Sequence, residues 1–187
     1  MIKKITPFAF VFLMMGCAAP QLDEFKINTY QDANPIGVKV DNIVVSSEIE
    51  HFERLPHIED EMPITPEAVL KEWADNRFYA TQSKKINTMH IVIKKAYMTK
   101  TIEKSDNWYT FDNELYKLSY DIKVNYISGE EIIYTQNVGG FESSSLPKKN
   151  SLADKEEIFE KMMNQMVKKV NDKILVQMPR EVLSKGY

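Results

Sequence analysis

The sequence predicts an α+β fold in which two helices pack on one face of a four-stranded, mostly antiparallel sheet. Three observations support this prediction: one segment alternates strictly between apolar and polar residues, two segments carry apolar residues at helical spacing, and the elements follow one another in the order β-α-β-β-β-α. A sheet with one solvated face needs cover on the other, and amphipathic helices provide it. The 187-residue chain has room for one such domain.

The clearest signal is the alternation between residues 116 and 126. Apolar or aromatic residues occupy every second position, and polar or charged residues stand between them. The apolar row is Tyr116, Leu118, Tyr120, Ile122, Val124 and Tyr126. Six matches at period two indicate an antiparallel strand with one buried face. Residues 38–45 are predicted to be a strand because they are rich in β-branched residues. Residues 88–102, where Met89, Ile91 and Ile93 alternate with other residues, and residues 130–138, which follow a turn, are predicted to be the other strands.

Small residues mark the expected breaks in the last strand pair. Ser128-Gly129 is a hairpin signal between residues 116–126 and 130–138. Gly139-Gly140 predicts a bulge or the end of the final strand. The serines at positions 143–145 are therefore expected to lie in a loop.

The first helix is predicted to begin at Thr65-Pro66-Glu67 and to end near Ala80. Thr is a good N-cap, Pro suits the first helical position, and Glu complements the helix dipole. Trp73 and Phe78 lie on its expected apolar face.

The second helix is predicted to begin at Ser151, where Ser151 and Asp154 resemble a capping box, and to end or kink at Pro179. Its methionines recur at helical spacing, which favours a place in the core; a groove for hydrophobic ligands is the alternative. These methionines are Met162, Met163, Met166 and Met178.

The first 17 residues have the organisation of a secretory signal peptide. Lys3 and Lys4 precede an apolar run at residues 5–15, and Gly16-Cys17 follows. The run is shorter than the roughly 20 residues that a membrane-spanning helix needs. Removal of both lysines changes the formal net charge from −3 to −5. A mildly acidic chain argues against nucleic-acid binding, which usually needs a basic surface.

Gly16-Cys17 behind an apolar run resembles the lipobox of bacterial lipoproteins. The resemblance implies that residues 1–16 are the signal peptide and that Cys17, the chain's single cysteine, carries a diacylglyceryl group and an N-acyl chain. Residues 17–37 would form a lipidated tether, and residues 38–187 a single domain. Ala18 in place of Asp implies the outer membrane, facing the periplasm, with the inner membrane as the alternative. No further cofactor is expected.

The expected element order behind a lipobox is similar to that of proteobacterial cell-envelope lipoproteins. It resembles the lipopolysaccharide-assembly (LptE-like) lipoproteins and the auxiliary lipoproteins of ABC-type transporters. Residues 65–77 and 153–157 are similar to segments of uncharacterised lipoproteins. The resemblance implies a membrane-anchored, non-enzymatic binding or scaffold component of an envelope assembly or lipid-transport complex, with an envelope protein as partner. A metal-dependent envelope enzyme and a carrier of lipids or small ligands remain alternatives.

Two clusters could carry function. His51 and His57 share an acidic loop with Glu59 and Asp60, and imidazole with carboxylate could ligate a divalent metal; a solvated acidic loop is the alternative. The aromatic cluster is either a hairpin end folded into the core or an exposed tip that contacts lipid or a partner. It consists of Trp108, Tyr109 and Phe111. The sequence contains no His-Glu-x-x-His or Gly-x-Ser-x-Gly motif, so no catalytic residue is assigned.

Overall fold

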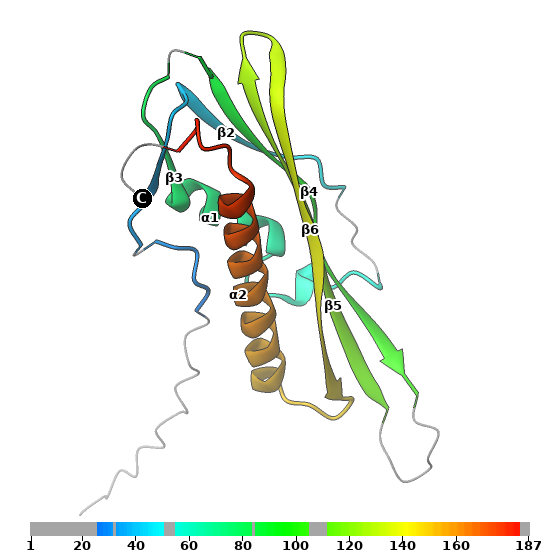
Figure 1. Ribbon diagram of the computed structural model, residues 1–187. Helices are drawn as coiled ribbons and strands as arrows, with labels where there is room; N and C mark the ends of the chain where they lie inside the picture. Colours follow the sequence, from blue (N-terminus) through cyan, green and yellow to red (C-terminus); the bar gives the residue numbers. More distant parts are fainter. Residues whose placement is uncertain (1–25, 32, 51–54, 84, 105–111, 184–187) are drawn as a thin grey trace, which may run out of the picture.

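The computed structural model describes residues 26–31, 33–50, 55–83, 85–104 and 112–183, and these form a helix-covered sheet (Figure 1). The sheet has the order β2-β4-β5-β6, with β2 parallel to β4 and the other neighbours antiparallel. Its strands are β2 (Asn42–Ser47), β4 (Thr88–Glu103), β5 (Asn113–Ser128) and β6 (Glu131–Pro147). Helices α1 (Pro66–Arg77) and α2 (Leu152–Gln177) lie on the same face. The predicted fold class is confirmed.

The core fills the space between this face and the two helices. The apolar row predicted on β5 is buried, with no member more than 3% exposed. All four methionines expected on the second helix are buried in the same core, which confirms the core interpretation over the groove. Ser151 and Asp154 form the predicted capping box at the start of α2. Among the described residues, no helix is long and apolar enough to cross a membrane.

The first predicted strand is in fact two strands. β1 (Ile36–Val38) pairs in parallel with β3 (Phe78–Ala80), and the chain then turns before β2 begins at Asn42. The Val40 N–H donates to the Val38 carbonyl at 2.8 Å, which closes this tight turn. Both valines are buried, so their β-branched pattern gives no sign of the break. The first helix consequently ends at Arg77 instead of near Ala80, because Phe78–Ala80 is used in β3.

β6 continues through Gly139 and Gly140, so the strand end predicted there is wrong. The serines expected in a loop are also part of this strand. Gly140 lies opposite Tyr120, and a Cβ atom at Gly140 would stand 2.7 Å from the Tyr120 hydroxyl oxygen. Glycine therefore makes room for the tyrosine ring. The bulge between β5 and β6 lies elsewhere, where the register shifts between Tyr126 and Ile127.

The described part of the expected tether packs on the helices. The Lys26 N–H donates to Glu160 Oε2 at 3.2 Å, and the Asn28 N–H donates to Asn164 Oδ1 at 2.7 Å. The Thr29 hydroxyl lies 2.9 Å from Glu72 Oε1 on α1. Polar groups thus hold this segment in place, and Ile27 and Tyr30 also pack against the core. Residues 26–31 and 33–37 therefore lie against the domain that the sequence predicts to begin at residue 38.

Candidate functional site

The described part of the predicted metal-binding loop lies against β4. His57 Nδ1 is 3.6 Å from Glu59 Oε1, and the His57 ring packs edge-on against Tyr97 with centroids 5.0 Å apart. Glu59 Oε1 also accepts a hydrogen bond from the backbone N–H of Met98 at 2.7 Å. Glu59 therefore anchors the loop to the sheet.

Residues 56–58 extend the sheet along the second half of β4. β2 pairs with β4 only from Thr88 to Ile93. Further along, the Ile58 N–H donates to the Met98 carbonyl at 3.2 Å, and the Lys100 N–H donates to the Pro56 carbonyl at 2.7 Å. This short antiparallel pairing covers backbone groups of β4 that would otherwise lie at an edge. The acidic loop thus has a structural role that its composition does not reveal.

The four residues predicted as weak metal ligands are only partly brought together. His57 and Glu59 are in contact, whereas Asp60 is exposed on the short helix η1 (Glu59–Glu61). His51 lies outside the described residues. Within the described ranges, no group of three or more His, Cys, Asp or Glu residues is placed to hold a metal ion.

Two other predictions also fall outside the described residues. The proposed lipidation site at Cys17 precedes the first described residue, Lys26. The aromatic cluster, Trp108, Tyr109 and Phe111, falls between β4 and β5 in a segment that the structure does not describe. Both remain predictions from the sequence.

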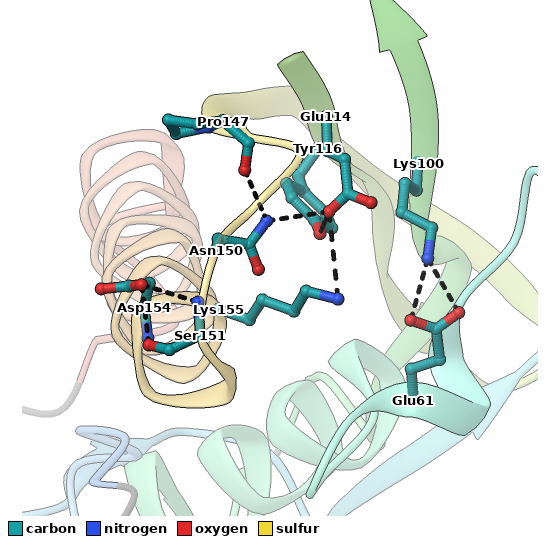
Figure 2. Close-up of polar contacts among 9 residues, drawn as sticks. All are labelled: Glu61, Lys100, Glu114, Tyr116, Pro147, Asn150, Ser151, Asp154 and Lys155. Carbon is teal, nitrogen blue, oxygen red and sulfur yellow. Dashed lines mark hydrogen bonds and ion pairs between the residues drawn. The ribbon is translucent and has the colours of Figure 1, made fainter. Parts of the chain in front are cut away.

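A cluster that the sequence did not indicate lies where the end of the sheet meets the start of α2 (Figure 2). We call it the Glu114 cluster; it consists of Glu61, Lys100, Glu114, Tyr116, Asn150 and Lys155. The Tyr116 hydroxyl donates to Glu114 Oε2 at 2.5 Å, and Asn150 Nδ2 donates to the same oxygen at 3.0 Å. Lys155 Nζ lies 3.9 Å from that oxygen. One carboxylate therefore joins β5, the β6–α2 connection and α2.

The electrostatics of the cluster favour an ionised Glu114. Burial by itself would raise the pKa of Glu114, but hydrogen bonds from Tyr116 and Asn150 and the positive charges of Lys155 and Lys100 outweigh it and hold the pKa below its ordinary value. Burial raises the pKa of Tyr116, and its hydrogen bond to the carboxylate raises it further. Tyr116 is therefore a neutral donor to a charged acceptor.

The cluster fixes elements in place, with one polar atom left over. Lys100 Nζ donates to both oxygens of Glu61 at 3.0 Å, which ties η1 to β4. Asn150 Nδ2 also donates to the Pro147 carbonyl at 2.9 Å, while its buried Oδ1 atom has no hydrogen-bond partner within the described part of the chain. Tyr116 stands in the alternating row of β5, so its phase in the strand could have indicated that its hydroxyl needs a buried acceptor.

A second carboxylate joins β6 to α2. Glu142 is 6% exposed, and Lys169 Nζ donates to both of its oxygens at 2.8 and 2.7 Å. Glu142 stands directly opposite Leu118, in phase with the apolar row of β5. Burial raises the pKa of Tyr120 to about 12, and the nearby Glu142 charge adds to the effect. A charged residue in the buried phase of a strand is the sequence signal for this pair.

The described residues also border an open groove of about 1140 Å³ between residues 26–33 and the two helices. Its lining includes Lys26, Thr29, Glu72, Asn164 and Lys168. Several of these groups are bonded to one another, because they hold the segment on the helices. Charged and amide side chains stand beside Ile27, Tyr30 and Ala33 in the lining, whereas a lipid carrier needs a predominantly apolar cavity.

No family model matches the chain, and no curated protein matches it. Solved structures do match. Uncharacterized lipoprotein B from Nitrosomonas europaea is 12% identical with a TM-score of 0.44, over 78% of this chain and 90% of that one. A minor lipoprotein from Acinetobacter baumannii is 6% identical with a TM-score of 0.41, over 79% and 97%. A neuraminyllactose-binding hemagglutinin homolog from Helicobacter pylori is 13% identical with a TM-score of 0.40, over 79% and 91%. Two of these three are thus described as bacterial lipoproteins, and at these identities the likeness assigns no function.

Proposed function

We propose that this chain is a lipid-anchored envelope lipoprotein that binds or scaffolds other envelope components and catalyses no reaction. One observation carries the proposal: three buried or partly buried carboxylates of the described residues, which an enzyme could use, are engaged in holding the fold together. Glu59 bonds a backbone N–H of β4, Glu114 joins the sheet to the start of α2, and Glu142 bonds Lys169. These three carboxylates serve the architecture of the domain, which supports a binding role over a catalytic one.

The anchor in this proposal is Cys17, and the geometry supports an anchor close to the domain. Lys26, nine residues after Cys17, is already bonded to α2 through its backbone N–H. Nine residues reach at most about 30 Å when fully extended. Acylation of Cys17 would therefore keep the domain near the periplasmic surface of the outer membrane. Two or more acyl chains on one cysteine give stable membrane anchoring.

Labelling of growing cells with a radioactive fatty acid tests the anchor. We expect label in the wild-type chain and none in Cys17→Ala, because the thiol is the acceptor. Fractionation of the outer and inner membranes then tests the location. A Cys17→Ala protein that still takes up label contradicts the proposed anchor.

Affinity purification of the acylated protein tests the binding role. Mass spectrometry of the purified material should find an envelope protein at a fixed ratio to this chain. A bound lipid without a protein partner would favour the carrier instead. Enzymatic turnover of an envelope component by the pure protein, abolished by His57→Ala, would favour the metal-dependent enzyme.

A further inference from the structure

β6 forms one edge of the four-stranded sheet, and its surface is unusually apolar for an edge. Ile132, Ile133, Tyr134 and Phe141 are all large exposed apolar residues on this strand, and Phe141 is 59% exposed. β6 is also long, with seventeen residues from Glu131 to Pro147. A long apolar edge strand is a template for pairing with another strand.

The ladder with β5 determines which backbone groups of β6 face outward. The Lys148 N–H donates to the Asp112 carbonyl at 2.8 Å, in register with the pair Asn113 and Pro147. In an antiparallel ladder, hydrogen-bonded and non-hydrogen-bonded residue pairs alternate. The backbone groups of the even-numbered residues of β6 from 134 to 146 therefore bond to β5. The backbone N–H and C=O groups of the odd-numbered residues from 135 to 145 point outward, away from β5. Lys173 Nζ donates to the Gly139 carbonyl at 3.3 Å, as an outward carbonyl allows.

The charges along β6 are arranged so that the strand complements itself. Glu130 and Glu131 stand at its start, and Lys148 and Lys149 follow its end. Residues 132–141 carry no charge, and Glu142 beyond them is bonded to Lys169 on the helix side. Antiparallel pairing of two copies would place the acidic start of one strand beside the basic end of the other, with no like charges opposed between them.

We propose that β6 pairs with β6 of a second copy in an antiparallel, two-fold symmetric arrangement, which joins the two sheets into one of eight strands. Full overlap of the seventeen residues places the two-fold axis at Gly139, the middle residue of the strand. Glycine lacks a Cβ atom and permits close approach of another backbone. In this register Asn137 stands opposite Phe141 of the partner subunit, and Glu130 stands opposite Lys148 of the partner subunit.

Lys173 on α2 is placed to oppose pairing at this edge. In the monomer its ammonium group occupies the Gly139 carbonyl, which the partner's Gly139 N–H would take in the dimer. Pairing also brings the two positively charged Lys173 side chains together across the two-fold axis. Their repulsion is weakened by water and salt, but it acts in the same direction as the lost hydrogen bond. Lys173 therefore opposes pairing, as lysines near sheet edges do in other proteins. Lys173→Met should strengthen the dimer.

Sedimentation of the purified full chain carrying Cys17→Ser tests the proposal without dependence on lipid. We expect a concentration-dependent dimer in this parent and a tighter one in Lys173→Met. Asn137→Pro removes an outward N–H without breaking the β5 ladder, so it should raise the concentration for half-dimerisation at least about tenfold. Asn137→Ala is the matched control and should behave as the parent does. A parent and Lys173→Met that both stay monomeric would overturn the proposal.

Disulfide formation tests the register and does not depend on the proline variant. Cys17→Ser leaves no other cysteine, so Asn137→Cys and Phe141→Cys can each be made as a single thiol. Opposed residues of an antiparallel pair have Cα atoms about 5.5 Å apart, within disulfide reach. Mixing the two variants should give a disulfide-linked heterodimer, while each alone gives little, because like residues lie four positions apart. Equal cross-linking in the mixture and in each variant alone would contradict this register.

Discussion

Glu114→Gln should weaken the fold although the side chain keeps its size. Glu114 accepts a hydrogen bond from Tyr116 at 2.5 Å and one from Asn150 at 3.0 Å, and Lys155 lies 3.9 Å away. Charge-assisted hydrogen bonds are about twice as strong as neutral ones, and the partly buried ion pair, at 3.9 Å, adds about 1 kcal/mol at most. The loss is therefore about 1.5 kcal/mol of unfolding free energy. For a domain of this size, this corresponds to a fall in Tm of roughly 3–6 °C.

The cost should depend on pH in a direction that the pKa of Glu114 determines. That pKa lies below its ordinary value of 4.5 in the folded state. A carboxyl group with a lowered folded pKa contributes stability that is fully present above its unfolded pKa and is lost as the pH falls through the folded pKa. The difference in Tm between wild type and Glu114→Gln should therefore be constant above about pH 5 and should narrow below about pH 4.5.

Thermal unfolding followed by circular dichroism between about pH 7 and pH 3 measures both quantities. Glu157→Gln is the matched control, because Glu157 is an exposed residue on the first turns of α2, and its change should stay within about 0.5 kcal/mol. A Glu114→Gln protein that melts at the same temperature as the wild type near neutral pH would refute the stabilising role of the carboxylate. A difference in Tm that does not narrow in acid would equally contradict the assigned role of the carboxylate.

Three further outcomes are expected. Gly140→Ala should lower the unfolding free energy by about 1–3 kcal/mol in chemical denaturation, because its Cβ atom would meet the Tyr120 ring. Gly139→Ala is the control and should cost less, because its Cβ atom would have only ordinary contacts. Adding Tyr120→Leu to Gly140→Ala should restore part of the lost stability. Ser151→Ala should cost about 1 kcal/mol in the same assay, since it removes the cap of α2, and an unchanged midpoint would show that the cap is dispensable. Titration with zinc in a calorimeter should give the same heats for the wild type and for His57→Ala. A binding heat that is lost in the variant would support a metal site at His57.

The sequence predicts strand positions best where one face of the sheet is buried and the other is exposed to solvent. The strict alternation on β5 leaves no freedom of register, because a one-residue slip would expose the whole apolar row. Prediction fails where one residue pattern is compatible with two different backbone structures. Val38 and Val40 suit a continuous strand, yet a turn separates them. Gly139 and Gly140 suggest a break, yet they lie within a strand because a tyrosine ring needs the space.

The polar clusters are harder to predict because they join residues far apart in the chain. Glu114 and Asn150 are thirty-six positions apart and meet only once β6 has returned beside β5. Glu142 could have been found from its phase with the apolar row, since a charge in that position requires a partner. The sequence places His57 and Glu59 close together, but it does not predict that their loop pairs with β4, because such backbone pairing has no sequence signature.

The attachment of residues 26–31 to α2 also determines the order in which the molecule can be completed. Hairpins such as β4–β5–β6 close over short stretches of chain, so they form early. Lys26 bonds to Glu160, which lies 134 positions later in the chain, and Asn28 bonds to Asn164, which lies 136 positions later. Residues 26–31 are synthesised long before α2 and must therefore wait for it before they can dock. Until then the α1–α2 surface that they cover stays open to water.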